Sequence, residues 1–196
     1  MEWDNLYKKR THRHKNMWPD NLIVQSITNN YSNTKNNSKI KIFEFGFGWG
    51  NNLRYLKENN FNYFGIEQSK TAYLNCKKRG YKNIYLGNFV DNDIFDNNFF
   101  DCIIDRQSLH HNNINDIRKI IDIFYKKLKP KGMIFSHLIS KANYEVKTTY
   151  FNKKRISNLF KKFTINKIEK HSTKIIKGKK TVINHEFYNL ELQKND

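Results

Sequence analysis

A short glycine-rich segment is the part of this sequence that most clearly suggests chemistry. Three of the eight glycines occupy alternate positions just after the acid Glu44: Gly46, Gly48 and Gly50. Glycine tolerates positive φ angles and lets a ligand approach the backbone closely. A helix that begins after such a turn directs free N–H groups and a partial positive charge towards it. Residues 46–51 are therefore predicted to cradle an anionic or strongly polar group.

A second acid, Glu67, ends the apolar run NYFGIE roughly twenty residues further on. A carboxylate at this point can accept two hydrogen bonds from the vicinal hydroxyls of a ribose, and it would repel a 2′-phosphate. The glycine spacing is GxGxG, whereas a dinucleotide site has GxGxxG. A nicotinamide dehydrogenase is therefore a weaker alternative for this pair of motifs.

Residues that can carry protons or charge follow the apolar run DCIID: Asp105, Arg106, His110 and His111. A histidine titrates near neutral pH and can remove a proton from a reacting group. Either histidine is a candidate base, and the acid and the arginine are candidates for shaping the site. The alternative is that a histidine only packs or caps the chain. The two histidines, and HRH at 12–14, lack a third and fourth ligand at metal-site spacing, so no metal is expected.

Strands and helices alternate along the chain around these residues. Strands are expected at residues 39–46, 62–68, 83–89, 101–105 and 133–139, and helices at 51–60, 70–80 and 152–163. A further amphipathic helix is expected in 115–132, where Pro130 and Gly132 stop it. Two alternating segments, 164–172 and 181–193, flank KGKK and indicate a final hairpin. Repeated strand–helix–strand units imply an α/β fold with a mostly parallel sheet and helices on both faces. Ligands bind such sheets beyond the carboxyl ends of the strands, where the strand order reverses.

In order and spacing, FEFGFGWGNN, YFGIEQS, LGNF and FDCIIDRQSLHH resemble the motifs of class I S-adenosylmethionine-dependent methyltransferases. The resemblance covers roughly residues 39–140. It implies a Rossmann-like, doubly wound, mostly parallel seven-stranded sheet with a C-terminal antiparallel β-hairpin. It also implies S-adenosylmethionine as the cofactor. The cofactor-binding residues that it implies are Glu44, Gly46, Gly48, Gly50, Glu67, Gln68, Asn88, Phe89 and Asp105.

Each motif has its own role in that family. The glycine loop holds the methionine end of the cofactor, and the acid that closes the second strand binds the ribose, which is the role implied for Glu67. An acid after the third strand often contacts the adenine amine. Asn88 departs from this pattern, although its amide oxygen can accept the same hydrogen bond. The fourth strand ends beside the transferred methyl group, which implies that the residues of DRQSLHH lie near the reaction.

The first 38 residues are expected to form a segment that covers the site, ahead of a methyltransferase domain over residues 39–196, because they are too few to hold a core. Their aromatic residues Trp3, Tyr7 and Trp18 are candidates for binding the substrate, since sugar rings stack on such side chains. The alternative for Trp18 is packing at the edge of the core. The pattern WDxxY…WPD resembles methyltransferases of bacterial surface-polysaccharide synthesis.

The composition limits the class of protein. The chain has 196 residues, which suits one domain. Its net charge of +18 comes mainly from lysines spread along the chain, with many Asn and Ile, as an AT-rich genome would produce. Cys76 and Cys102 have no metal-site spacing and fit reduced thiols. The absence of a signal-peptide pattern and of a long apolar run predicts a cytoplasmic protein without a membrane span.

These observations predict an enzyme that transfers methyl groups to a small polar acceptor, with a sugar hydroxyl as the favoured target. An RNA or DNA methyltransferase is the main alternative, and the basic charge favours it. The segment after the fourth predicted strand lacks the Asn/Asp-Pro-Pro-aromatic motif of nucleic-acid amino methyltransferases, and it lacks a nucleophilic cysteine. A non-catalytic binding module on the same fold is a further alternative. The sequence predicts no oligomeric state.

Overall fold

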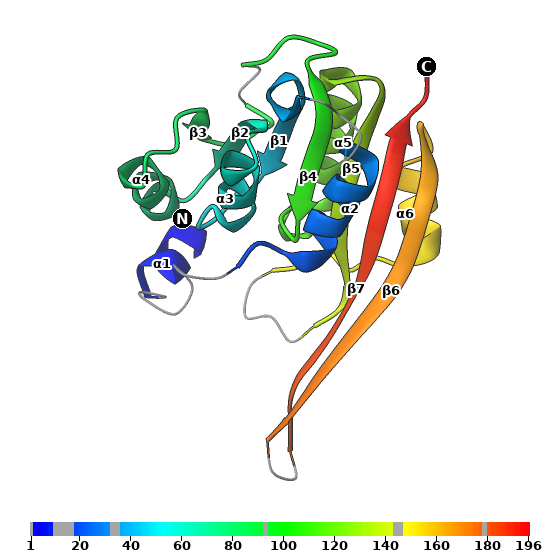
Figure 1. Ribbon diagram of the computed structural model, residues 1–196. Helices are drawn as coiled ribbons and strands as arrows, with labels where there is room; N and C mark the ends of the chain where they lie inside the picture. Colours follow the sequence, from blue (N-terminus) through cyan, green and yellow to red (C-terminus); the bar gives the residue numbers. More distant parts are fainter. Residues whose placement is uncertain (1, 10–17, 32–35, 92–93, 143–146, 178–179) are drawn as a thin grey trace.

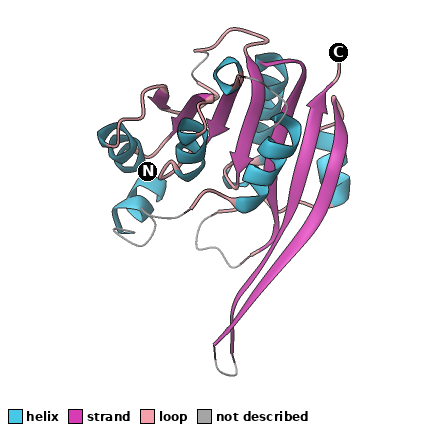
Figure 2. Ribbon diagram, viewed as in Figure 1, coloured by secondary structure: helices cyan, strands magenta, loops and turns pink. Residues whose placement is uncertain are grey.

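The computed structural model describes residues 2–9, 18–31, 36–91, 94–142, 147–177 and 180–196. The HRH motif at 12–14 and the centre of the predicted final turn, residues 178–179, lie outside this part of the chain. The described residues form one seven-stranded sheet in the order β3-β2-β1-β4-β5-β7-β6. Helices cover both faces of the sheet, as Figure 1 and Figure 2 show.

The strands run parallel from β3 to β5, whereas β7 is antiparallel to both β5 and β6. They are β1 (Lys41–Phe45), β2 (Asn62–Glu67), β3 (Ile84–Leu86), β4 (Phe100–Arg106), β5 (Leu128–Lys141), β6 (Phe163–Lys177) and β7 (Lys180–Lys194). The predicted Rossmann-like, doubly wound sheet with an antiparallel C-terminal hairpin is therefore confirmed.

The helices begin where the sequence offers a capping side chain or a glycine turn. They are α1 (Glu2–Lys9), α2 (Asn21–Tyr31), α3 (Asn51–Glu58), α4 (Lys70–Lys78), α5 (Ile114–Lys127) and α6 (Lys153–Leu159), with the 3-10 turns η1 (Asn37–Lys39) and η2 (Leu109–His111). Ser69, Asn113 and Asn152 accept hydrogen bonds from backbone N–H groups in the first turns of α4, α5 and α6. These bonds satisfy donors that have no partner within the helix.

The helix that Pro130 and Gly132 were expected to stop ends at Lys127, ahead of Pro130, which cannot donate a backbone bond and clashes within a helix. Two other predicted elements have the wrong bounds. The strand expected over 83–89 is only three residues long, and residues 28–31, expected as a loop, continue α2.

Each face of the sheet carries its own apolar cluster. α2, α3 and α4 cover one face, where Ile23 and Ile27 of α2 pack with Ile42 of β1, Ile104 of β4 and Phe135 of β5. α5 and α6 cover the other face. Its cluster joins Phe43, Phe45 and Ile103 of the strands to side chains of these helices and of the residue after α6: Ile117, Ile120, Phe124, Ile156 and Phe160. α2 therefore contributes to the core, although it precedes the first strand.

The strand order reverses between β1 and β4. The chain leaves β1 towards β2 on one side, and it leaves β4 towards β5 on the other. The loops after these two strands therefore diverge at the carboxyl edge of the sheet and leave a place for a ligand between them.

The final hairpin extends past this edge. β7 pairs with β5 from Gln193 as far as Glu186. Beyond that point β6 and β7 pair only with each other, and they continue as a two-stranded ribbon beyond the rest of the sheet (Figure 1). None of the helices in the described ranges has the length and apolarity needed to cross a bilayer.

Truncation of Ile27 should show that α2 belongs to the core. Ile27→Ala removes a side chain that has no exposed surface. It should lower the free energy of unfolding by about 2–5 kcal/mol in urea titrations, because it leaves a cavity. Gln25→Ala, on the exposed side of the same helix, should change it by about 0.5 kcal/mol or less. Equal effects of the two variants would show that α2 is not part of the core.

Candidate active site

The loop between β1 and α3 has a backbone conformation that requires glycine. Gly46, Gly48 and Gly50 have φ angles of 69°, 52° and 72°, which L side chains rarely adopt. A Cβ atom at Gly46 would lie 2.3 Å from Oγ of Ser108, and one at Gly48 would lie 2.5 Å from the hydroxyl of Tyr7. The alternate glycines therefore form a tight turn that other segments approach from two sides.

Glu44 is buried just before this loop, with 2% of its surface exposed. Its Oε1 accepts a hydrogen bond of 2.7 Å from Nδ2 of Asn52. Its Oε2 is buried and has no hydrogen-bond partner among the described residues. Burial raises the pKa of the carboxyl to about 8. A buried acceptor without a donor is costly, so this oxygen fits a ligand group that carries positive charge and donates protons.

Glu67 connects the end of β2 to the glycine loop. Its Oε2 accepts a hydrogen bond of 2.8 Å from the N–H of Gly48. Its Oε1 accepts a hydrogen bond of 2.8 Å from the N–H of Ser69, the N-cap residue of α4. Burial raises the pKa of Glu67, although these two bonds oppose the shift. The acid predicted at the second strand therefore lies directly against the loop predicted as the cradle.

The remaining predicted cofactor residues near β2 and β3 differ in their surroundings. Gln68 is half-buried and follows Glu67 directly. Oδ1 of Asn88 accepts a bond of 3.2 Å from the N–H of Val90 and so closes its own turn. The ring of Phe89 is buried and stacks on Phe43, with 4.9 Å between the ring centroids. Phe89 therefore has a place in the apolar core beneath the site.

Asp105 is fully buried at the end of β4, and both carboxylate oxygens are occupied. Oδ1 accepts bonds from the N–H groups of Ser108 and Leu109, and Oδ2 accepts a bond of 2.6 Å from the hydroxyl of Ser136. Burial raises its pKa to about 6. Asp105 therefore holds the turn that leads into η2 and fixes its position against β5.

Arg106 forms an ion pair that the sequence motifs did not reveal. Its Nε lies 3.1 Å from Oδ2 of Asp20. Oδ1 of Asp20 accepts bonds from the first N–H groups of α2, and its own N–H donates to Oδ1 of Asn52 at 2.9 Å. A chain of contacts therefore connects Glu44, through Asn52 and Asp20, to Arg106. The only sequence signal for Asp20 is its place as a helix-capping residue before an apolar helix.

The two predicted candidate bases have different surroundings. His110 has no exposed surface, and burial holds its pKa well below the usual value. The ring centroids of His110 and His111 lie 4.1 Å apart. His111 is half-buried, and burial lowers its pKa to about 4. Both rings are therefore neutral at pH 7. In the part of the chain that the structure describes, no three His, Cys, Asp or Glu side chains come together as metal ligands.

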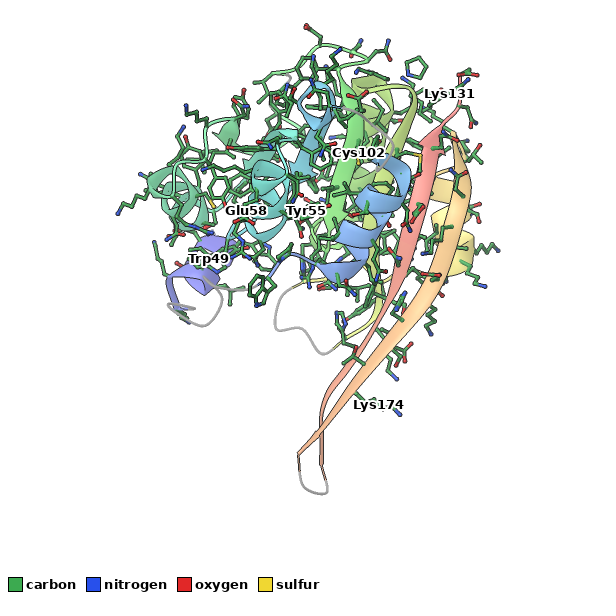
Figure 3. The ribbon with its side chains drawn as sticks, viewed as in Figure 1. Trp49, Tyr55, Glu58, Cys102, Lys131 and Lys174 are labelled. Carbon is green, nitrogen blue, oxygen red and sulfur yellow. The ribbon has the colours of Figure 1, made fainter. Side chains whose placement is uncertain are left out.

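α1 lies across the loops of the site. Oδ1 of Asp4 accepts bonds from the hydroxyl of Ser69 (2.9 Å) and the N–H of Thr71 (2.8 Å) at the start of α4. The ring of Trp3 meets His111 edge-on at 4.5 Å, and the ring of Tyr7 meets Trp49 edge-on at 5.1 Å. Figure 3 shows Trp49 beside α1. Two of the three predicted substrate-binding aromatics are therefore at the site.

Trp18, the third of these aromatics, is 79% exposed, and the guanidinium of Arg54 lies 4.8 Å from its ring centroid. The alternative that Trp18 packs at the edge of the core is therefore wrong.

Comparison with known proteins agrees with this geometry. Residues 43–136 match the family model for a methyltransferase domain. No curated protein matches the chain. Among similar solved structures, the Burkholderia thailandensis 1,6-didemethyltoxoflavin-N1-methyltransferase, with bound 1,6-didemethyltoxoflavin and S-adenosylhomocysteine, is 12% identical with a TM-score of 0.70, and the match covers 100% of this chain and 86% of that one.

Two further solved structures are similar. A structure described for the conversion of a disulfide bond into a thioacetal group in echinomycin biosynthesis is 14% identical with a TM-score of 0.73, covering 99% of this chain and 91% of that one. A SAM-dependent methyltransferase from Methanosarcina mazei is 15% identical with a TM-score of 0.64, and the match covers 79% of this chain and 92% of that one. At these identities the likeness establishes the fold.

Residues 43–136, which match the methyltransferase domain, lie within a Rossmann-like sheet that the similar solved methyltransferases share. The protein is an S-adenosylmethionine-dependent methyltransferase, and S-adenosylmethionine is its cofactor. The residues present fit this cofactor, because the buried Oε2 of Glu44 lacks a donor in the described part of the chain and suits the ammonium of its methionine part.

The buried carboxyl of Glu44 should make the stability of the protein without cofactor depend on pH. Its pKa is about 8 in the folded state and 4.5 in the reference state. Between these values the folded protein holds a proton that the unfolded chain releases, so stability falls as the pH rises, by up to about 1.4 kcal/mol per unit. Below this range both states are protonated, and the effect disappears.

Glu44→Gln should remove this dependence, because the amide does not titrate. Urea titrations at pH 5 and pH 8 should show that the variant gains stability relative to the original protein as the pH rises. Parallel pH profiles for the two proteins would show that Glu44 is not held protonated in the fold.

Proposed function

We propose that the protein transfers a methyl group from S-adenosylmethionine to a hydroxyl of a small polar acceptor, with a sugar of surface-polysaccharide synthesis as the favoured class. The observation that carries the proposal is the position of α1. Its aromatic side chains Trp3 and Tyr7 lie over His111 and the glycine loop. Aromatic rings of this kind suit the faces of a sugar, and a covered site suits a small molecule.

The cofactor would lie across the carboxyl ends of β1 and β2. Glu44 would receive the ammonium of the methionine part, and the glycine loop from Gly46 to Gly50 would hold that part through backbone groups. Glu67 would receive the ribose hydroxyls, with Gln68 beside it and Asn88 at the adenine. The cofactor supplies an activated methyl group, and the protein supplies alignment and exclusion of water.

The residues after β4 would then have separate roles. Asp105, whose oxygens are both bonded within the protein, would position the turn. His110, which has no exposed surface, would pack beneath it. Arg106 and His111 would face the acceptor side, where Trp3 contacts the ring of His111. The first 38 residues would accordingly provide both a lid, α1, and a core helix, α2.

The Burkholderia thailandensis neighbour supports a small-molecule acceptor, because its structure holds 1,6-didemethyltoxoflavin together with S-adenosylhomocysteine. The net charge of +18 is the observation that favours RNA or DNA instead. Several lysines of the final hairpin are neutralised locally: Lys167 pairs with Glu169, and Lys170 pairs with Glu186. This pairing weakens the case for a nucleic-acid surface on the hairpin.

Glu67→Ala should abolish or strongly weaken cofactor binding. Isothermal titration calorimetry with S-adenosylhomocysteine should show an affinity loss of about tenfold to a hundredfold, because the ribose loses two charge-assisted bonds and the glycine loop loses its anchor. Glu58→Ala, which removes an exposed acid of α3, should bind as the original protein does. Equal affinities for both variants would contradict the proposed cofactor pose.

A transfer assay tests the acceptor. The enzyme is incubated with methyl-tritiated S-adenosylmethionine and either the small-molecule extract or the total RNA of cells that lack its gene. Label should enter the small-molecule fraction in an alkali-stable ether. Label in RNA, tested again across salt concentrations, would replace the proposal by the nucleic-acid alternative. Label in neither fraction, with cofactor still bound, would favour a binding module.

Loosening α1 should accelerate release of the cofactor product. Asp4→Ala removes the acceptor for Ser69 and Thr71 at the start of α4. Stopped-flow dissociation of S-adenosylhomocysteine should become on the order of tenfold faster. Asn5→Ala changes an exposed neighbour on the same helix and serves as the matched control. Unchanged dissociation in Asp4→Ala would show that α1 does not cover the cofactor.

A further inference from the structure

We propose that His185 of β7 is the catalytic base that takes the proton of the acceptor hydroxyl, and that Gln107 positions it. The inference rests on the proposed transfer to a hydroxyl and adds a residue to that site. His185 and Gln107 come from parts of the chain that are 78 residues apart, yet Nε2 of the ring lies 3.4 Å from Nε2 of the amide.

The topology places both residues at the reactive edge of the sheet. Gln107 is the first residue after β4, the strand whose end lies beside that of β1. His185 is one residue past Glu186, the last residue of β7 that pairs with β5. The ring is therefore carried by the start of the projecting ribbon, at the point where the ribbon leaves the sheet. From there it meets the loop that follows β4.

The backbone of Gln107 is held in an unfavourable conformation. Its φ angle is 59°, in the left-handed region that non-glycine residues seldom occupy. Asp105 holds the next two residues by bonds to their N–H groups, so the turn cannot relax without losing buried hydrogen bonds. Strained residues of this kind concentrate at active sites, where the surroundings impose the conformation.

The hydrogen bond to Gln107 defines the state of the ring. An amide nitrogen can only donate, so Nε2 of His185 must accept and must carry no proton. Partial burial, and then the charge of Arg106, lower the pKa of His185. Gln107 and Phe187, whose ring centroid lies 5.5 Å away, contact the imidazole, and Arg106 and His110 interact with it electrostatically. The ring is therefore neutral at pH 7 and able to take a proton.

The other histidines of this region are less suited to the step. His110 and His137 have no exposed surface. His111 has its ring against Trp3. His171 stacks on Phe187 and pairs with Glu169 on β6. Among these rings, His185 combines partial exposure with a position at the end of β4.

The chemical step is balanced without a further reactant. The hydroxyl of the acceptor takes the place of the Gln107 amide on Nε2 of His185 and accepts a bond from that amide. The hydroxyl oxygen forms a bond to the methyl carbon while the carbon–sulfur bond breaks and leaves its electron pair on sulfur. The hydroxyl proton passes to Nε2 and then to water.

The test combines kinetics with a measurement on the ring itself. In the tritium assay with the small-molecule extract, His185→Asn and His185→Gln should lower the rate by about a hundredfold or more, with affinity for S-adenosylhomocysteine unchanged within about twofold. Protonation of His185 should make the activity of the original enzyme decline at acid pH, and both variants should lose this decline. His171→Asn, on the adjacent strand, should retain full activity.

Imidazole nitrogen NMR provides the second readout. His185 should appear neutral with an unprotonated Nε2 at pH 7, and Gln107→Ala should raise its pKa or change its tautomer while leaving cofactor affinity intact. Full activity in both His185 variants, or a protonated Nε2, would overturn the inference but leave the proposed function standing. Absence of transfer by the original enzyme would overturn both, and circular dichroism with the binding titration identifies any variant that does not fold.

Discussion

A buried carboxylate is costly unless its oxygens are met by donors, and this constraint organises the carboxyl edge of the sheet. Glu67 accepts hydrogen bonds from the glycine loop and from the start of α4, and Asp105 accepts them from the turn before η2. Asp20 accepts hydrogen bonds from the start of α2 and pairs with the guanidinium of Arg106. Glu67 and Asp105 lie at the carboxyl ends of β2 and β4, and Asp20 lies just before α2. Their hydrogen bonds therefore fix the positions of the loops that meet at this edge. Glu44 is the exception, since one of its oxygens lacks a donor among the described residues.

This exception has a physical meaning for the enzyme. A site whose acids were all satisfied internally would offer little to a cationic ligand. A site with one buried unsatisfied oxygen binds a donor at that point strongly, because binding removes a penalty that is already present. The cost appears as reduced stability of the protein without ligand, in line with the general tension between stability and active-site function.

The parts of this design that depend on local sequence could be predicted. Alternating strands and helices, the left-handed glycines and the acid at the end of β2 all follow from neighbouring residues, and the fold agrees with them. The contacts between distant segments could not be predicted in this way. Asp20 meets Arg106 and His185 meets Gln107 only after the sheet has assembled. The stacking of Phe89, a residue implied for the cofactor, on Phe43 likewise joins distant parts of the chain.

The segment ahead of β1 shows the same limit. Its aromatic residues indicated a role at the site, and α1 with Trp3 and Tyr7 lies there. Its apolar residues Ile23 and Ile27 are spaced for one face of a helix, and they pack on the sheet in the same apolar cluster as residues of α3 and α4. One stretch therefore supplies both a helix beside the loops of the candidate site and a part of the core, which composition alone does not separate.

In the ribbon formed by β6 and β7, the position of the His185 ring and the length of the ribbon are determined separately. The register of β7 on β5 places the ring of His185, whereas the number of residues beyond it determines only how far the ribbon reaches. Equal insertions near the tip would lengthen the ribbon without turning any side chain between the tip and the sheet. A single insertion between His185 and Glu186 would turn the ring to the opposite face. The reach of the ribbon can therefore change while the ring of His185 stays in place.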